Sequence, residues 1–385
     1  MSKKRYLTLG ICNDETSSVC LFINGFLASA VSEERFSRTK YDNSFPIKSI
    51  NYILKEHNIS LQRIDAVVYS WAKGLNPLLK NRYEKRFSSL KKDKKKYKIF
   101  SLRYKYEIIR DKKKKEEFKK WANKNLTKKQ LSKLKTYYHH DAHAASAALL
   151  SPFDKGLVIT ADARGDFESL TISVFDRNKI NPLKKIYSSL SADSFGFFYG
   201  RITGLLGFKP MAHEGKITGL AAHGNPSKAL SLMKKMIDVK NGKVTAKLGD
   251  LYRPFFKPYS KVLKKKINRY SREDIAAAAQ KHLENCLCKL TKFYSKKLKI
   301  KSSNLMLAGG VFANVKLNYK LKSLKFIKKV FVQPQMGDGG LCLGAATLYL
   351  HQKKFKITPL KNVFLGPKVS TKSILLVKKK FKKIK

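Results

Sequence analysis

Three of the eight histidines in this 385-residue sequence fall within one short segment, His139-His140-Asp141-Ala142-His143. On a helix, His139 and His143 would project from the same face, because they are four positions apart. Two imidazoles in that arrangement suit one divalent metal ion, which also needs a further ligand, usually a carboxylate. Asp338, in a glycine-rich turn before an expected helix, is the candidate. An Asp at a helix start is equally typical of an ordinary N-cap, so the spacing alone leaves both interpretations open.

Two further segments have the composition of loops that bind phosphate or a nucleotide. Gly309 and Gly310 lie between an expected strand and an expected helix. Glycines there let a nucleotide approach the backbone, and the N-terminus of a helix favours phosphate. The segment 162–166, which contains Asp162 and Gly165, is a second candidate for a phosphate or metal site. Taken singly, each segment is also typical of a tight connection or an ordinary hairpin.

The elements that must position these residues alternate between strands and helices, which predicts α/β architecture. Asn24-Gly25 is a strong hairpin signal between two short apolar runs, and a second hairpin is expected around 162–166. The recurrence of such a hairpin in the two halves of the chain predicts two related lobes. Residues 79–135 form a Lys-rich insertion with helical periodicity. Strands are expected at 6–12, 19–23, 26–31, 64–71, 156–163, 170–175, 305–307 and 330–333, and helices at 46–57, 137–150, 194–208, 272–298, from about 313, and at 337–351.

The composition allows a substantial core and is strongly basic. Hydrophobic residues make up 43% of the chain, and 82 Lys and Arg residues stand against 27 Asp and Glu, a formal charge of +55. Net charge by itself specifies a partner weakly, and we find no module of Arg with interleaved aromatics, so no nucleic-acid partner is expected. No apolar run reaches the ~18 residues of a membrane span. Five cysteines without a CxxC pair indicate a cytoplasmic chain with free thiols.

Five blocks of sequence, taken in order, resemble the NodU/CmcH-type carbamoyltransferases. They are SEERFSR at 32–38 with Phe45-Pro46, HHDAHAASA at 139–147, EGKITGLA at 214–221, AGGV at 308–311, and GDGG at 337–340. The resemblance implies a two-lobed ASKHA-type domain (the fold of actin and the sugar kinases), with mixed sheets flanked by helices, over residues 1–355. It also implies transfer of a carbamoyl group from carbamoyl-adenylate to a hydroxyl of a small-molecule or glycan acceptor.

The same resemblance implies roles for particular residues. Iron or a similar divalent metal would be held by His139, His143 and Asp338. The ATP-derived nucleotide would lie against Gly309, Gly310 and Asn314, with Asp162, Gly165 and Lys216 as further candidates. The first loop, where the family usually has His-Asp, reads Asn13-Asp14 in this chain. Asn is not a base near neutral pH, so Asp14 is the candidate replacement and Asn13 the departure from the pattern.

The last residues raise the question of a second domain. In the family a YrdC-like domain makes carbamoyl-adenylate, and residues 360–367 resemble its start. Residues 356–385 are therefore expected to be a basic tail corresponding to the beginning of that domain, and a separate YrdC-like adenylating chain is an expected partner. Two alternatives stay open: a protein resembling the tRNA threonylcarbamoyl-adenosine synthases, and a catalytically impaired nucleotide-binding subunit.

Overall fold

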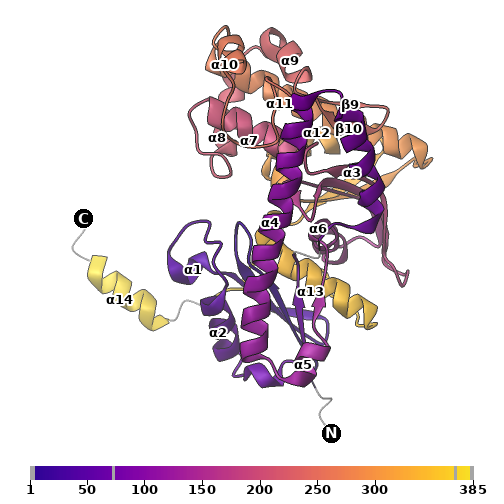
Figure 1. Cartoon of the computed structure of the whole chain (residues 1–385). Coiled ribbons are helices and arrows are strands. Elements are labelled where there is room, and N and C mark those ends of the chain that lie inside the picture. The colour runs from indigo at the N-terminus through magenta and orange to yellow at the C-terminus, as the bar shows by residue number, and fades with distance from the viewer. Residues whose placement is uncertain (1–4, 72–73, 368–370, 382–385) are drawn as a thin grey trace.

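A computed structural model describes residues 5–71, 74–367 and 371–381. The chain forms two lobes, each built on a five-stranded mixed sheet (Figure 1). The first sheet contains β1 (Leu7–Cys12), β2 (Ser18–Ile23), β3 (Phe26–Ser32), β4 (Ala66–Tyr69) and β5 (Lys135–Thr136), in the order β3-β2-β1-β4-β5. The second contains β6 (Lys155–Gly165), β7 (Glu168–Asp176), β8 (Leu183–Leu190), β11 (Ser303–Ala308) and β12 (Ile327–Val332), in the order β12-β11-β6-β7-β8.

The two sheets share one topology. In each, three consecutive strands form an antiparallel meander, β1-β2-β3 in the first lobe and β6-β7-β8 in the second. Two later strands are then added in parallel beside the first strand of the meander, β4 and β5 in one sheet and β11 and β12 in the other. The expectation of two related lobes with mixed sheets is therefore confirmed.

Two helices pack against each other between the sheets. α6 (His139–Leu149) contacts β6, β7 and β11 of the second sheet, and α13 (Leu341–Gln352) contacts β1, β2 and β4 of the first. Gly344 permits the close approach, because a Cβ there would collide with the carbonyl of Ala142. The alanine-rich sequence of α6 keeps the spacing small along the whole contact. The ends of both helices are thereby fixed relative to both lobes.

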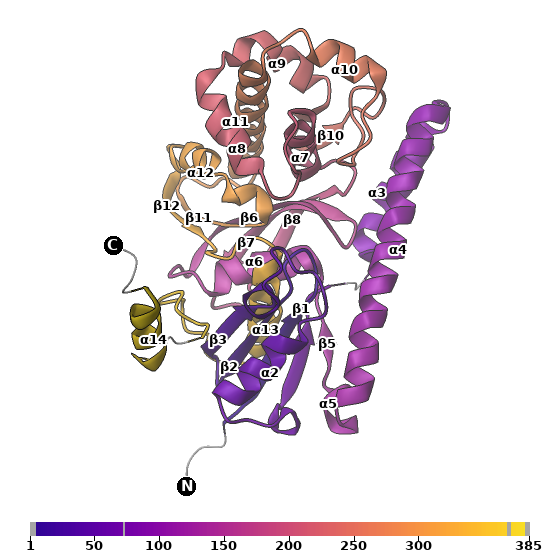
Figure 2. The same ribbon diagram turned by 90° about the vertical axis from the view of Figure 1, so that its left-hand side faces the viewer.

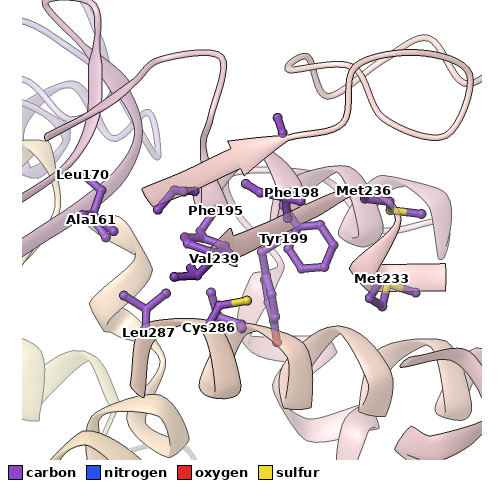
Figure 3. Close-up of a cluster of buried hydrophobic side chains, with 14 of the residues drawn as sticks. Ala161, Leu170, Phe195, Phe198, Tyr199, Met233, Met236, Val239, Cys286 and Leu287 are labelled. Carbon is purple, nitrogen blue, oxygen red and sulfur yellow. The ribbon is translucent and has the colours of Figure 1, made fainter. Parts of the chain in front are cut away.

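The helices of the second lobe enclose a large apolar core. They are α7 (Phe195–Leu205), α8 (Glu214–Leu220), α9 (Pro226–Lys234), α10 (Lys261–Ile267), α11 (Arg272–Lys297) and α12 (Val315–Lys322). Figure 3 shows Phe195, Phe198 and Tyr199 of α7 meeting Cys286 and Leu287 of α11 in this core. Burial of such side chains stabilises the lobe by roughly 1.5–3 kcal/mol for each large residue.

The Lys-rich insertion forms α3 (Pro77–Leu90), α4 (Lys94–Asn125) and α5 (Lys128–Ser132). Asn76 and Asp93 cap the first two of these helices by accepting hydrogen bonds from the backbone N–H groups of Leu78 and Lys96. α4 runs along one side of the molecule and passes both lobes (Figure 2). Its first turns place Phe100 in the second-lobe core, and its last turns place Phe118 in the first-lobe core.

The sequence predictions missed β8 and the hairpin formed by β9 (Ile237–Lys240) and β10 (Lys243–Ala246). The β9–β10 turn is Asn241-Gly242, with both residues at positive φ, which is the same signal that identified Asn24-Gly25. Short lysine-bearing strands obscured it. The remaining helices are α1 (Glu34–Ser37), α2 (Ile47–Glu56) and α14 (Thr371–Phe381). Glu33 of the SEERFSR block accepts hydrogen bonds from the N–H groups of Lys48 and Ser49, so it holds the start of α2.

The segment after α13 returns to the first lobe. Ile357 is buried, and the N–H of Leu360 donates to the carbonyl of Leu150. The carbonyl of Leu365 accepts from the backbone N–H of Ala30 on the edge strand β3. Phe364 beside it is 91% exposed. Within residues 5–71, 74–367 and 371–381, no helix has both the length and the apolar character needed to cross a bilayer.

Candidate metal centre and transfer site

Four side chains meet where the two lobes join. They are His139 and His143 on the first turns of α6, Asp162 on β6, and Asp338 in the turn that precedes α13. His143 Nε2 lies 3.2 Å from Asp162 Oδ2 and 3.5 Å from Asp338 Oδ1. His139 Nε2 lies 3.5 Å and 3.8 Å from the same two oxygens. The sequence analysis brought together three of these residues and placed Asp162 with the nucleotide.

Local backbone features of β6 bring Asp162 to the histidines. The predicted polar loop 162–166 is instead a continuation of the strand, with irregular pairing to β7 between Ala161 and Gly165. The hairpin closes one step later at Asp166-Phe167, where both residues have positive φ. Gly165 lies against the ring of His139, where a Cβ would collide with the imidazole. Its role in the structure is therefore to let β6 approach the start of α6.

Burial and the two carboxylates give the histidines different proton affinities. Burial lowers the pKa of His139 to about 4, so its imidazole is neutral at pH 7. Burial alone would also lower the pKa of His143, but Asp162 and Asp338 outweigh that effect and raise it to about 9. Burial, with the negative charges of Asp162 and Asp14, raises the pKa of Asp338. The pKa shifts of the two histidines have opposite signs because burial and the nearby carboxylates act on them to different extents.

The four residues fit a divalent metal ion. Neither ring nitrogen of His139 has a hydrogen-bond partner in the part of the chain that the structure describes, although both are buried. The four ligand atoms all lie within 4.8 Å of one another. Ligands about 2.1 Å from one ion stand roughly 3–4 Å apart, which matches the distances found here. His140 does not join the group, because its Nδ1 atom is hydrogen-bonded to Thr160.

The glycine turn lies next to this group. Gly309 has φ +99°, and a Cβ there would collide with the backbone of Ala161. Gly310 is exposed, and a Cβ there would meet only Asp162 Oδ1, at 3.5 Å. Asn314 caps α12 through the N–H of Leu317, and its amide exchanges hydrogen bonds with Gln280. A nucleotide could therefore approach the turn at Gly310.

Lys216 does not lie in the metal group. It is exposed on α8, with its Nζ atom 5.6 Å from the centre of the Phe208 ring. Thr218, two residues further along the same helix, lies 3.5 Å from the amide of Asn314. The EGKITGLA block therefore flanks the glycine turn through Thr218.

Asn13 and Asp14 of the first loop are both buried. The amide of Asn13 donates to Glu117 at 2.9 Å and accepts a short hydrogen bond from the Tyr69 hydroxyl. One oxygen of Asp14 accepts a short charged hydrogen bond from Arg110. Its other oxygen is buried and finds no partner among the described residues. Asp14 thus keeps one oxygen able to accept a proton, whereas the amide of Asn13 is hydrogen-bonded through both its nitrogen and its oxygen.

The middle of α4 supplies a row of buried and half-buried charged side chains that the sequence analysis did not identify. Arg110 and Glu117 hold the first loop, and Glu107 pairs with Arg164 of β6 at 2.6 Å. Their spacings of three and seven residues put them on one face of the helix. That spacing could have been found in the sequence, but the abundant lysines of the insertion masked it.

The comparisons with known proteins bear on this arrangement. Residues 8–347 match the family described as carbamoyltransferase N-terminus. This chain belongs to that family. The resemblance to carbamoyltransferases predicted from the five sequence blocks is therefore confirmed.

Relatives of this carbamoyltransferase-family chain include proteins of archaea and bacteria. An uncharacterized protein of Methanocaldococcus jannaschii is 32% identical over 364 residues, which are 94% of this chain and 60% of that protein. Nodulation protein NolNO of Sinorhizobium fredii is 29% identical over 350 residues, 89% of this chain and 48% of that protein. The chain thus spans about half to three fifths of the length of these curated relatives.

Solved structures support the fold. The HypF protein of T. kodakarensis superposes with a TM-score of 0.50 at 12% identity, covering 91% of this chain and 48% of HypF. At that identity the likeness shows the fold alone. Together with the repeated sheet topology, it confirms the predicted ASKHA-type, two-lobed architecture.

A second group of side chains that could bind metal lies inside the second lobe, where Asp238, His282 and Cys286 meet. His282 Nε2 is already hydrogen-bonded to the carbonyl of Ile237 at 2.6 Å. Burial raises the pKa of the Cys286 thiol to about 12. The thiol is therefore protonated at neutral pH, and Cys286 is part of the apolar core (Figure 3).

Proposed function

We propose that this chain carries the transfer site of an O-carbamoyltransferase, which moves a carbamoyl group from carbamoyl-adenylate to a hydroxyl of a small-molecule or glycan acceptor. The observation that carries the proposal is the convergence of His139, His143, Asp162 and Asp338, whose ligand atoms all lie within 4.8 Å of one another. Membership of the carbamoyltransferase family supports the same activity. A metal ion with two imidazoles and two carboxylates would supply Lewis-acid polarisation of the carbamoyl carbonyl or the phosphate.

The residues of the chain suggest how the donor is held. The N-terminal ends of α6 and α13 meet at the site, and helix N-termini favour negatively charged phosphate. The exposed Gly310 leaves room for the adenylate beside Asp162. His139, His143, Asp162 and Asp338 contain the nitrogen and oxygen donors that Fe²⁺, Mn²⁺ or Zn²⁺ accept, and we propose Fe²⁺ as the resident ion.

In the transfer step, the acceptor hydroxyl oxygen attacks the carbamoyl carbon and forms the new C–O bond. The bond between the carbamoyl carbon and the phosphate oxygen breaks, and AMP leaves with the electron pair. The hydroxyl proton passes to the free oxygen of Asp14, while Arg110 holds the other oxygen of the same carboxylate. Asn13, fixed by Tyr69 and Glu117, positions the loop that carries this base.

The carbamoyl-adenylate would be made by a YrdC-like adenylating domain, either in the same protein or in a separate chain. The exposed Phe364, beside the strand edge at Ala30, offers apolar surface for such a domain. This chain alone should then release no pyrophosphate from ATP in the presence of carbamoyl phosphate. Pyrophosphate release by the isolated chain would contradict the proposal that an adenylating domain makes the carbamoyl-adenylate.

Transfer itself is tested by incubating the chain with synthetic carbamoyl-adenylate and candidate acceptors, and by detecting the mass gain of one carbamoyl group. Asp14→Asn should lower the transfer rate by about 100-fold or more, a typical contribution of a general base, with adenylate affinity unchanged. Glu15→Gln is the matched control, since Glu15 also pairs with Arg110 but is part-exposed. Equal losses in both variants would reject Asp14 as the base.

A further inference from the structure

Asp111 stands out on the buried face of α4 because it is left without a partner. It is 5% exposed, and neither of its carboxyl oxygens has a hydrogen bond within the described parts of the chain. Burying a carboxyl group without a hydrogen bond costs folding free energy, because the group loses its hydrogen bonds to water. Such a cost in a folded protein requires an explanation, and one is a ligand that supplies the missing hydrogen bonds.

The cations near Asp111 are engaged elsewhere. Arg164 Nη1 is 2.6 Å from Glu107, and Arg110 binds Asp14 and Glu15. Lys114 Nζ donates to the carbonyl of Asn43 at 3.0 Å. The carboxyl of Asp111 therefore has no cation of its own among the described residues, although the chain as a whole carries a formal charge of +55.

Two neighbours of Asp111, Arg110 and Asp166, contact residues of the transfer site. Its neighbour Arg110 holds one oxygen of Asp14, whose other oxygen is also buried and without a partner in the described chain. Asp166, whose charge acts directly on Asp111, accepts a 2.7 Å hydrogen bond from the backbone N–H of His139. The charge of Asp14 also acts on Asp111, so these two buried carboxyl groups, each with an oxygen that lacks a hydrogen bond in the described chain, lie near each other.

We infer that Asp111 binds the carbamoyl acceptor through a second hydroxyl, so that the acceptor is a polyol such as a sugar rather than a simple alcohol. This inference rests on the proposed function, because it takes Asp14 as the base for the reacting hydroxyl. One carboxyl would then receive the reacting proton while the other fixes the orientation of the acceptor. The long helix of the insertion would thereby select the acceptor.

The proton affinity of Asp111 favours a hydroxyl over an ammonium group. Burial, followed by the charges of Asp166 and Glu107, raises the pKa of Asp111 to about 9. A neutral carboxyl group both donates and accepts hydrogen bonds, as a hydroxyl does, whereas an ammonium group can only donate. A neutral polyol therefore suits this environment better than an amine.

The test compares two ring alcohols that differ by a single hydroxyl, cyclohexanol and a vicinal cyclohexanediol, as acceptors from carbamoyl-adenylate. The native chain should show a kcat/KM about 3- to 10-fold higher for the diol, the worth of one neutral hydrogen bond. Asp111→Ala should abolish that preference, so that kcat/KM falls more for the diol than for cyclohexanol, and Asp111→Asn should retain part of it. Lys112→Ala, on the exposed side of α4, serves as the control.

Binding of the diol is measured separately by saturation-transfer NMR without any donor. A diol signal that is present in the native chain and lost in Asp111→Ala supports the inference, even if neither alcohol is carbamoylated. The absence of carbamoylation would count only against the proposed function. An Asp111→Ala chain that keeps both the diol preference and the diol signal would overturn the inference. Asp111→Asn, which preserves shape, provides the same comparison if the alanine variant fails to fold.

Discussion

Arg164 donates a 2.6 Å hydrogen bond to Glu107, and this ion pair joins the bulged end of β6 to the middle of α4. Arg103, one turn earlier on α4, approaches the same carboxylate at 3.0 Å. All three side chains are buried. Because β6 also carries Asp162, the position of the metal group depends on how α4 is held.

Removal of Glu107 should destabilise the protein more than any ordinary surface change. Glu107→Ala would leave two buried guanidinium groups without their shared carboxylate, and we expect a loss of about 3–5 kcal/mol in the free energy of unfolding. Urea unfolding followed by circular dichroism measures this loss. Glu116→Ala on the exposed face, whose nearest cation is 4.0 Å away, should change stability by less than about 0.5 kcal/mol. Equal stabilities of the two variants would show that the buried pair is not needed.

The metal group should lose its ion when any one ligand is removed. His143→Ala, Asp338→Ala and Asp162→Asn should each lower the bound divalent metal at least ~10-fold from near one equivalent, because each removes a direct ligand. Inductively coupled plasma mass spectrometry of the purified chain provides the measurement. His351→Ala, at a half-buried histidine far along α13, should keep the native content. A metal-bearing Asp162→Asn variant would exclude Asp162 from the ligand set.

The two adjacent glycines should respond differently to substitution. Gly310→Leu should fold normally but lose adenylate binding, since its Cβ has space and its side chain would occupy the proposed nucleotide position. Gly309→Ala should instead lower the free energy of unfolding by more than ~1 kcal/mol, because its φ of +99° and the Ala161 backbone exclude a Cβ. Calorimetry with carbamoyl-adenylate and thermal unfolding separate these effects. Native affinity in Gly310→Leu would place the nucleotide elsewhere.

The buried carboxyl of Asp111 should make stability depend on pH. Burial and the charges of Asp166 and Glu107, with a smaller contribution from Asp14, raise its pKa to about 9 against the lowering effect of Arg164. Between about pH 4 and 9 the folded state therefore binds more protons than the unfolded state, and stability from this group falls as pH rises. Asp111→Asn removes that dependence, so its stability relative to the native chain should rise by several kcal/mol from pH 4 to pH 9, because each unit of pKa shift is worth about 1.4 kcal/mol.

This comparison needs a control for the many other groups that titrate in the same range. Glu116→Gln lies on the same helix but is exposed, so the difference in unfolding free energy between it and the native chain should stay flat from pH 4 to pH 9. A flat difference for Asp111→Asn as well would mean that Asp111 ionises normally in the folded protein.

Several features of this protein were accessible from local sequence. The spacing of His139 and His143 indicated a shared helix face, and Asn24-Gly25 indicated a hairpin, because both signals depend only on backbone periodicity and turn chemistry. The same kind of reasoning found the strand-to-helix turn at Gly309. The family followed from five such blocks taken in order, even though each block alone was weak.

Only the tertiary structure decided which side chains converge. Asp338 reaches the histidines because α13 packs closely on α6 at Gly344, a contact between segments almost two hundred residues apart. Asp162 joins them because β6 continues through most of the predicted loop, as far as Gly165. The charged face of α4, including Asp111, is buried because both lobes pack against that helix. Such long-range packing leaves no local periodic signal, so the sequence predicted the helix but not what it covers.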